Sequence, residues 1–123
     1  MNRTILVVED EELVREFTVD LLGELGYRVL SASNGRDALQ LLEREPGVDL
    51  LFTDIVMPGE LDGFALAREA RQRRPRLPVL YTSGYTNRVG ENAAAASLGK
   101  MLPKPYRPDQ LRDEIRRALD RAV

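Results

Sequence analysis

Five side chains that could do chemistry follow short apolar segments of the sequence. Glu9 and Asp10 follow the first segment, Asp54 the third, Ser83 the fourth and Lys104 the fifth. If these segments are parallel strands, the five residues share one rim of a sheet, because parallel strands end at the same edge. Three carboxylates at one rim repel one another unless a cation lies among them. The set predicts a site that places a phosphoryl group on Asp54, with a metal ion and Lys104 neutralising its oxygens.

The chain contains neither histidine nor cysteine. This excludes Ser-His and Cys-His catalysis within the chain, and it excludes imidazole and thiolate metal sites. A metal ion would have to be held by oxygen atoms, which points to Mg²⁺ or a similar hard cation. The chain also cannot supply a phosphohistidine, so a phosphoryl group carried on histidine would have to come from a partner.

Composition indicates one domain without a strong electrostatic preference. The 123 residues can form one core, and no repeat or linker divides residues 1–123. A net charge of −2, from 18 basic and 20 acidic residues, favours neither nucleic acid nor a membrane as a direct partner. No apolar run reaches bilayer-spanning length and no signal-peptide pattern is present, so we expect a cytoplasmic protein. The first strand follows Met1 closely and no DNA-binding domain follows Val123, which favours a free-standing protein.

The elements that must position these residues alternate between strands and helices. Runs of β-branched and apolar residues predict five strands. They are Thr4–Val8, Arg28–Ala32, the run Leu50–Phe52 ending at Asp54, Val79–Thr82 and Lys100–Pro103.

Helical periodicity and capping residues predict five helices between and after these strands. The first carries Leu13, Phe17, Leu21 and Leu25 as its buried stripe, widened by Val14 and Leu22, and ends at Gly26. The second is capped by Asn34, carries Ala38, Leu41 and Leu42, and ends before Pro46. The third is capped by Asp62, spans Gly63 to about Arg74 and buries Phe64, Ala67 and either Ala70 or the stem of Arg71. The fourth is Asn87–Ser97, and the last begins near Pro108 and buries Leu111, Ile115, Ala118 and Leu119.

This alternation predicts an α/β fold with a doubly wound, five-stranded parallel sheet. The strand order 2-1-3-4-5, that of flavodoxin-like folds, places the most apolar strand in the centre and the strand containing Pro103 at an edge. It also creates a switch point between the first and third strands, where open α/β sheets bind their ligands.

Four motifs carry a resemblance to the receiver domains of two-component response regulators, over essentially the whole chain. I-L-V-V-E-D-E resembles the family's acidic pocket and F-T-D-I-V-M-P its phosphoacceptor strand. V-L-Y-T-S-G resembles the strand with the switch hydroxyl, and L-P-K-P-Y the lysine-proline signature. The loop at Gly59–Leu61 and the motifs T-S-G-Y-T and L-P-K-P-Y are most similar to those of receivers of hybrid histidine kinases and their free-standing relatives.

The resemblance implies a role for each matched position. Asp54 would accept the phosphoryl group from a sensor histidine kinase or a phosphotransfer protein, and the change would alter binding to a downstream protein. Asp10 and Asp54 would bind Mg²⁺ directly, with the backbone carbonyl of Val56 as a further ligand and Glu9 acting through water.

The same resemblance assigns roles on the fourth and fifth strands. Ser83 and Lys104 would contact the phosphoryl oxygens, and the Lys104–Pro105 peptide bond would be cis. Met101 occupies the position that often carries a switch aromatic in the family. Val56 and Tyr85 would border the approach of a hydrolytic water and slow its attack. The loop at Gly59–Leu61 is one residue longer than the commonest form.

Other functions fit the sequence less well. A phosphohydrolase with an aspartyl-phosphate intermediate typically has a second aspartate two residues after the nucleophile, where this chain has Val56. A flavin-binding module would need a phosphate-cradling loop after the first strand, where Glu9, Asp10 and Glu11 would repel the phosphate. A pseudo-receiver that only binds is disfavoured by the intact set of acids, hydroxyl and lysine.

Overall fold

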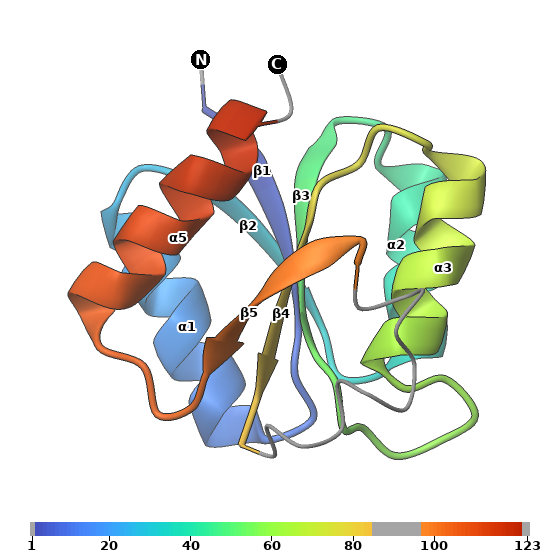
Figure 1. Ribbon diagram of the computed structural model, residues 1–123, viewed down its shortest axis with the longest axis horizontal. Coiled ribbons are helices and arrows are strands. Elements are labelled where there is room, and N and C mark those ends of the chain that lie inside the picture. Colours follow the sequence, from blue (N-terminus) through green and yellow to red (C-terminus); the bar gives the residue numbers. More distant parts are fainter. Residues whose placement is uncertain (1, 85–96, 122–123) are drawn as a thin grey trace.

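The computed structural model describes residues 2–84 and 97–121. Five parallel strands form one sheet in the order β2-β1-β3-β4-β5, as predicted (Figure 1). The strands are β1 (Thr4–Val8), β2 (Arg28–Ala32), β3 (Val48–Asp54), β4 (Val79–Ser83) and β5 (Gly99–Pro103). Strands β4 and β5 are each one residue longer than the sequence predicted. The strand with Pro103 lies at the edge, where a missing N–H leaves no buried partner unsatisfied.

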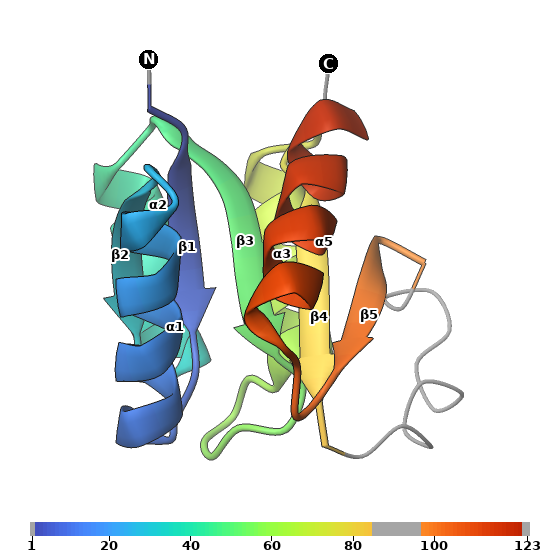
Figure 2. The same cartoon turned by 90° about the vertical axis from the view of Figure 1, so that its left-hand side faces the viewer.

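Four helices in the described residues cover the two faces of the sheet. They are α1 (Glu12–Glu24), α2 (Gly35–Arg44), α3 (Gly63–Arg73) and α5 (Pro108–Arg121). Helices α1 and α5 lie on one face and α2 and α3 on the other, as Figures 1 and 2 show. The predicted helix Asn87–Ser97 falls, except for its last residue, outside the described residues.

The predicted capping residues are confirmed. Asn34 accepts a hydrogen bond from the Asp37 N–H at 2.8 Å, and Asp62 accepts one from the Ala65 N–H at 2.8 Å. Each cap satisfies one of the N–H groups that the first turn of a helix leaves without a partner. Gly26, with φ +98°, ends α1 in the left-handed conformation that glycine adopts without strain.

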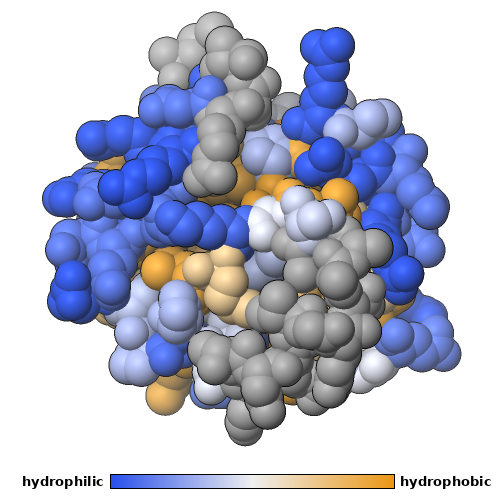
Figure 3. Space-filling model, in the orientation of Figure 1, coloured by the Kyte–Doolittle hydropathy of each residue, from blue (hydrophilic) through white to orange (hydrophobic). Residues whose placement is uncertain are grey.

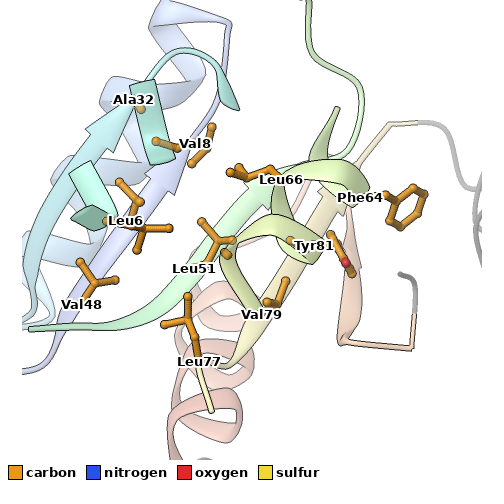
Figure 4. Packing of buried hydrophobic residues seen from close by; sticks show 14 of the residues in the cluster. Leu6, Val8, Ala32, Val48, Leu51, Phe64, Leu66, Leu77, Val79 and Tyr81 are labelled. Carbon is orange, nitrogen blue, oxygen red and sulfur yellow. The ribbon is translucent and has the colours of Figure 1, made fainter. Parts of the chain in front are cut away.

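Alternate residues of each central strand point into two separate hydrophobic clusters. Leu6 and Val8 pack with α2 and α3, in the cluster of which Figure 4 shows one part. Ile5 and Val7 pack on the opposite side, with residues of α1 and α5 such as Leu22 and Ile115. The face shown in Figure 3 is hydrophilic over much of its periphery and shows apolar patches toward its centre.

The predicted buried face of α1 is wrong for Leu13 and Phe17, while the predicted Leu22 is buried. Leu13 is 80% exposed and Phe17 is 49% exposed, whereas Thr18 and Leu22 are buried against the sheet. Residues that are four positions apart in a helix differ in direction by about 40°, because the helix has 3.6 residues per turn. The row from Leu13 to Leu25 therefore cannot stay on one face, and its first members lie in solvent.

An ion pair fastens the amino end of strand β5 to α5. Glu114 is buried and contacts Lys100 at 2.9 Å and Arg117 at 2.7 Å. Burial alone would raise the pKa of Glu114, but the hydrogen bonds from Lys100 and Arg117 outweigh it and lower that pKa. The edge strand that carries Lys104 at its far end is thus held by charge as well as by the sheet.

Candidate functional site

The three predicted acids come together at the carboxyl ends of β1 and β3. One carboxylate oxygen from each of Glu9, Asp10 and Asp54 lies within 4.8 Å of the other two. Glu9 is 3% exposed and Asp54 is 5% exposed, while Asp10 faces solvent at the edge of the group. The arrangement concentrates negative charge at one partly open position of the rim.

Lys104 lies inside this acidic group. Its Nζ donates a hydrogen bond to Glu9 Oε1 at 2.6 Å and another to Asp54 Oδ2 at 3.0 Å. Burial by itself lowers the pKa of Lys104, but the hydrogen bonds to Glu9 and Asp54 outweigh it and the pKa is raised. The lysine therefore stays an ammonium and neutralises part of the charge.

One ammonium does not balance three carboxylates. Partial burial and the adjacent Glu9 carboxylate raise the pKa of Asp10, which means that the site resists a third negative charge. Oxygen ligands of this kind are those that Mg²⁺ prefers in proteins. The three carboxylates therefore fit a hard divalent cation.

Glu9 is held by backbone contacts that the sequence pattern did not reveal. Its N–H donates to the Ala32 carbonyl at 3.1 Å, and its Oε2 accepts from the Glu11 N–H at 3.1 Å. Arg15 of α1 donates to the Glu9 carbonyl at 2.9 Å. These contacts fix the side chain that shares Lys104 with Asp54, so Glu9 orients the ammonium.

The backbone at Asp54 and Ile55 packs closely against the start of α3. The Gly63 N–H donates to the Ile55 carbonyl at 2.7 Å, which brings the two backbones together. A Cβ at position 63 would lie 2.1 Å from the Asp54 carbonyl oxygen and 2.7 Å from the Ile55 Cα. Only glycine permits this approach, so Gly63 sets where the end of β3 lies.

We expect Gly63→Ala to lower the free energy of unfolding by about 3 kcal/mol, since overpacking against backbone cannot be relieved by a side-chain rotation. Urea unfolding followed by circular dichroism measures the loss. Gly47→Ala is the matched control, because a Cβ at Gly47 meets nothing within 4 Å. Equal stability of the two variants would contradict the close approach.

Ser83 and Pro105 lie beside this group as the motifs suggested. Ser83 ends β4 and is buried, and its carbonyl accepts a hydrogen bond from the Lys104 N–H at 3.0 Å. The Lys104–Pro105 peptide bond is cis, as the resemblance implied.

The structure describes three of the four remaining predicted features. Val56 is 36% exposed, two residues after Asp54. Met101 is partly buried, pairs in register with Tyr81 of β4 and packs against the cluster under α3. Tyr85 lies outside the described residues. The long loop after Pro58 packs on α2, where Glu60 pairs with Arg36 at 3.3 Å.

An apolar groove beside Lys104 is the feature that sequence reasoning missed. Leu13, Val14 and Phe17 of α1 line one side and Pro105 and Tyr106 the other, around a volume of about 300 Å³. Lys104 borders the same groove, so it adjoins the acidic group. The unusual exposure of two large apolar residues at this place marks a candidate binding surface.

Comparison with known proteins gives consistent matches. The sequence pattern of the response regulator receiver domain matches residues 5–116. The chain is 37% identical over 118 residues to the response regulator receiver protein CpdR of Brucella abortus, covering 95% of this chain and 97% of CpdR. It is 38% identical over 122 residues to the sensor kinase CckA of the same species, covering 98% of this chain but only 13% of CckA.

A solved structure agrees with the sequence matches. The response regulator protein TrrA from Thermotoga maritima, in complex with Mg²⁺ and BeF, superposes with a TM-score of 0.86. The two chains are 28% identical, and the match covers 95% of this chain and 99% of TrrA. Within the described residues, no helix has both the length and the apolar character needed to span a bilayer.

Proposed function

The chain belongs to the response regulator receiver domain family of two-component signalling, and on this basis we propose that residues 1–123 form a single receiver domain in which Asp54 accepts the phosphoryl group. The observation that carries the assignment is the position of Asp54, a buried acid with an ammonium at 3.0 Å and two further acids beside it. Of these three acids, Glu9 and Asp54 are buried, but only Asp54 ends the central strand of the sheet.

We propose a transfer step that this geometry supports. The bond between phosphorus and a partner's histidine nitrogen breaks as an Asp54 oxygen forms a new bond to phosphorus, and the histidine leaves with the electron pair. Lys104 stabilises the charge on the phosphoryl oxygens, and Ser83 contacts one of them. Asp10, Asp54 and the Val56 carbonyl would hold Mg²⁺, with Glu9 acting through water; bound Mg²⁺ supplies further neutralisation of those oxygens.

Phosphorylation then changes binding to a downstream protein partner. We propose that Ser83 moves toward the new oxygens and that the surface near β5 and α5 changes with it. Met101 is a flexible side chain, so we expect its adjustment to be gradual. Val56 offers no hydrogen bond to an attacking water, which favours a long-lived phosphoryl group.

The domain acts as a regulatory module and not as an enzyme on other substrates, so a phosphohydrolase is not favoured. We propose that the protein is located in the cytoplasm, because histidine kinases are phosphorylated there by ATP.

Incubation of the protein with acetyl phosphate and Mg²⁺ tests the proposal. We expect intact mass spectrometry to show the addition of one phosphoryl group, which alkaline hydroxylamine removes because it cleaves acyl phosphates. Absence of labelling under these conditions would contradict a phosphoacceptor role.

The groove beside Lys104 is where we propose that the protein phosphodonor docks. It is almost wholly apolar and adjoins the residue that contacts Asp54. Exposed acids also lie along α1, at Glu12, Glu16, Asp20 and Glu24, and the first two directly precede the groove residues Leu13 and Phe17. A complementary partner is a helix with apolar residues flanked by basic ones, since like charges across an interface disfavour binding.

We expect Leu13→Ser combined with Phe17→Ser to slow transfer from an autophosphorylated histidine kinase about tenfold or more, because central apolar contacts dominate interface energies. Labelling by acetyl phosphate should not change, since the small molecule needs no docking surface. Leu25→Ser is the control: it is an exposed leucine just beyond the carboxyl end of α1, far along the helix from the groove. Equal slowing with both donors would place the defect in the site instead of the groove.

A further inference from the structure

Two hydroxyl groups meet beneath the groove and join α1 to the loop that follows Lys104. Thr18 Oγ1 and the Tyr106 hydroxyl share a hydrogen bond of 2.7 Å, although the residues are 88 positions apart in the sequence. Thr18 is only 1% exposed, on the inward face of α1. Burial raises the pKa of Tyr106, so its hydroxyl keeps its proton at neutral pH.

The loop needs such an attachment because it departs from the sheet at once. The Lys104 N–H donates a hydrogen bond to the Ser83 carbonyl at the end of β4, at 3.0 Å. Pro105 has no N–H to donate. The Tyr106 ring then packs against Phe52 of β3, with ring centroids 6.0 Å apart.

The position of this loop decides where the Lys104 ammonium lies. A lysine side chain has four rotatable bonds, so its reach to Glu9 and Asp54 depends on a fixed backbone. The ring contact with Phe52 limits how deeply the Tyr106 ring is buried, and the hydrogen bond to Thr18 fixes the position of the Tyr106 hydroxyl. The two contacts together attach the Tyr106 side chain to the sheet and to α1.

We propose that Thr18 and Tyr106 are positioning residues for Lys104, and that their shared hydrogen bond holds the ammonium in place for phosphoryl transfer. The inference rests on the proposed function of Asp54 and names two residues that would act through the lysine without touching the phosphoryl group. A hydroxyl pair suits this role because a phenylalanine at 106 could keep the ring packing but would lose the attachment to α1.

The test is the rate of labelling by acetyl phosphate at saturating Mg²⁺, for Tyr106→Phe, Thr18→Val and the double variant. Each single variant should be about fivefold slower, the loss that one hydrogen bond represents. The double variant should be no slower than either single one, because both remove the same contact. Tyr27→Phe, which removes a hydroxyl from the same hydrophobic cluster, should label at the wild-type rate.

The same substitutions in a Lys104→Met background separate positioning from a structural role. If Thr18 and Tyr106 act through Lys104, they should have no further effect once the ammonium is gone. The proposal is overturned if the single variants label at the wild-type rate, or if their slowing persists in the Lys104→Met background. Failure of the unsubstituted protein to label would instead contradict the proposed function of Asp54.

Discussion

Asp54→Asn is expected to abolish labelling by acetyl phosphate. Asparagine keeps the shape of the buried side chain at the end of β3 but offers no carboxylate oxygen to attack phosphorus. Its amide would also leave Lys104 with one anionic partner, Glu9, in place of two. Intact mass spectrometry after incubation with acetyl phosphate and Mg²⁺ measures the result, and peptide mapping of the unsubstituted protein locates the group.

The matched control is Asp49→Asn, at the other end of the same strand. Asp49 accepts a hydrogen bond from the Thr4 N–H, and an asparagine oxygen can still accept it. This variant should label like the unsubstituted protein. Labelling should also stop when a chelator removes divalent cations, because Glu9, Asp10 and Asp54 then repel an incoming phosphoryl group. Undiminished labelling of Asp54→Asn would show that another residue accepts the group.

Lys104→Met is expected to have two opposite effects. Labelling should slow by about 10²-fold, because the ammonium that stabilises charge on the transferring group is lost. Mg²⁺ binding should become about tenfold tighter, because a positive charge close to the cation is removed while the carboxylates remain. A role for Lys104 as a mere surface residue predicts neither effect.

Two measurements separate these effects. Titration with Mg²⁺, monitored by calorimetry or by amide chemical shifts, gives the Mg²⁺ affinity. Labelling by acetyl phosphate at saturating Mg²⁺ gives the rate of phosphoryl transfer. Lys100→Met is the control, since Lys100 is the only other lysine in the chain and lies at the amino end of the same strand. Weaker Mg²⁺ binding by Lys104→Met would mean that the ammonium does not compete electrostatically with the cation.

The sequence predicted the sheet and its rim because their signals are local. A short apolar run followed by an acid or a turn marks each strand end, and Asn34 and Asp62 mark the helix starts that follow two loops. Parallel pairing then brings residues as distant as Glu9 and Lys104 to one edge without further information. The acids, Ser83 and Lys104 were predictable for this reason.

The details that could not be predicted depend on packing between elements. The buried face of α1 includes Thr18, a polar residue that an apolar count ignores, and its hydroxyl shares a hydrogen bond with Tyr106, 88 positions later in the sequence. The sequence likewise could not show that Lys104 contacts Glu9 at 2.6 Å as well as Asp54. Such contacts depend on side-chain lengths across a gap that the pattern does not specify.

The division of the core into two clusters has a consequence for how this protein can diverge over evolution. The proposed docking groove on α1 rests on the cluster shared with α5, while Met101 and α3 rest on the cluster across the sheet. Substitutions that are far apart and share no contacts usually have additive effects. Duplicated copies of the gene could therefore acquire new phosphodonors by changes in the groove on α1 while the packing of Met101 and α3 on the other face is inherited intact.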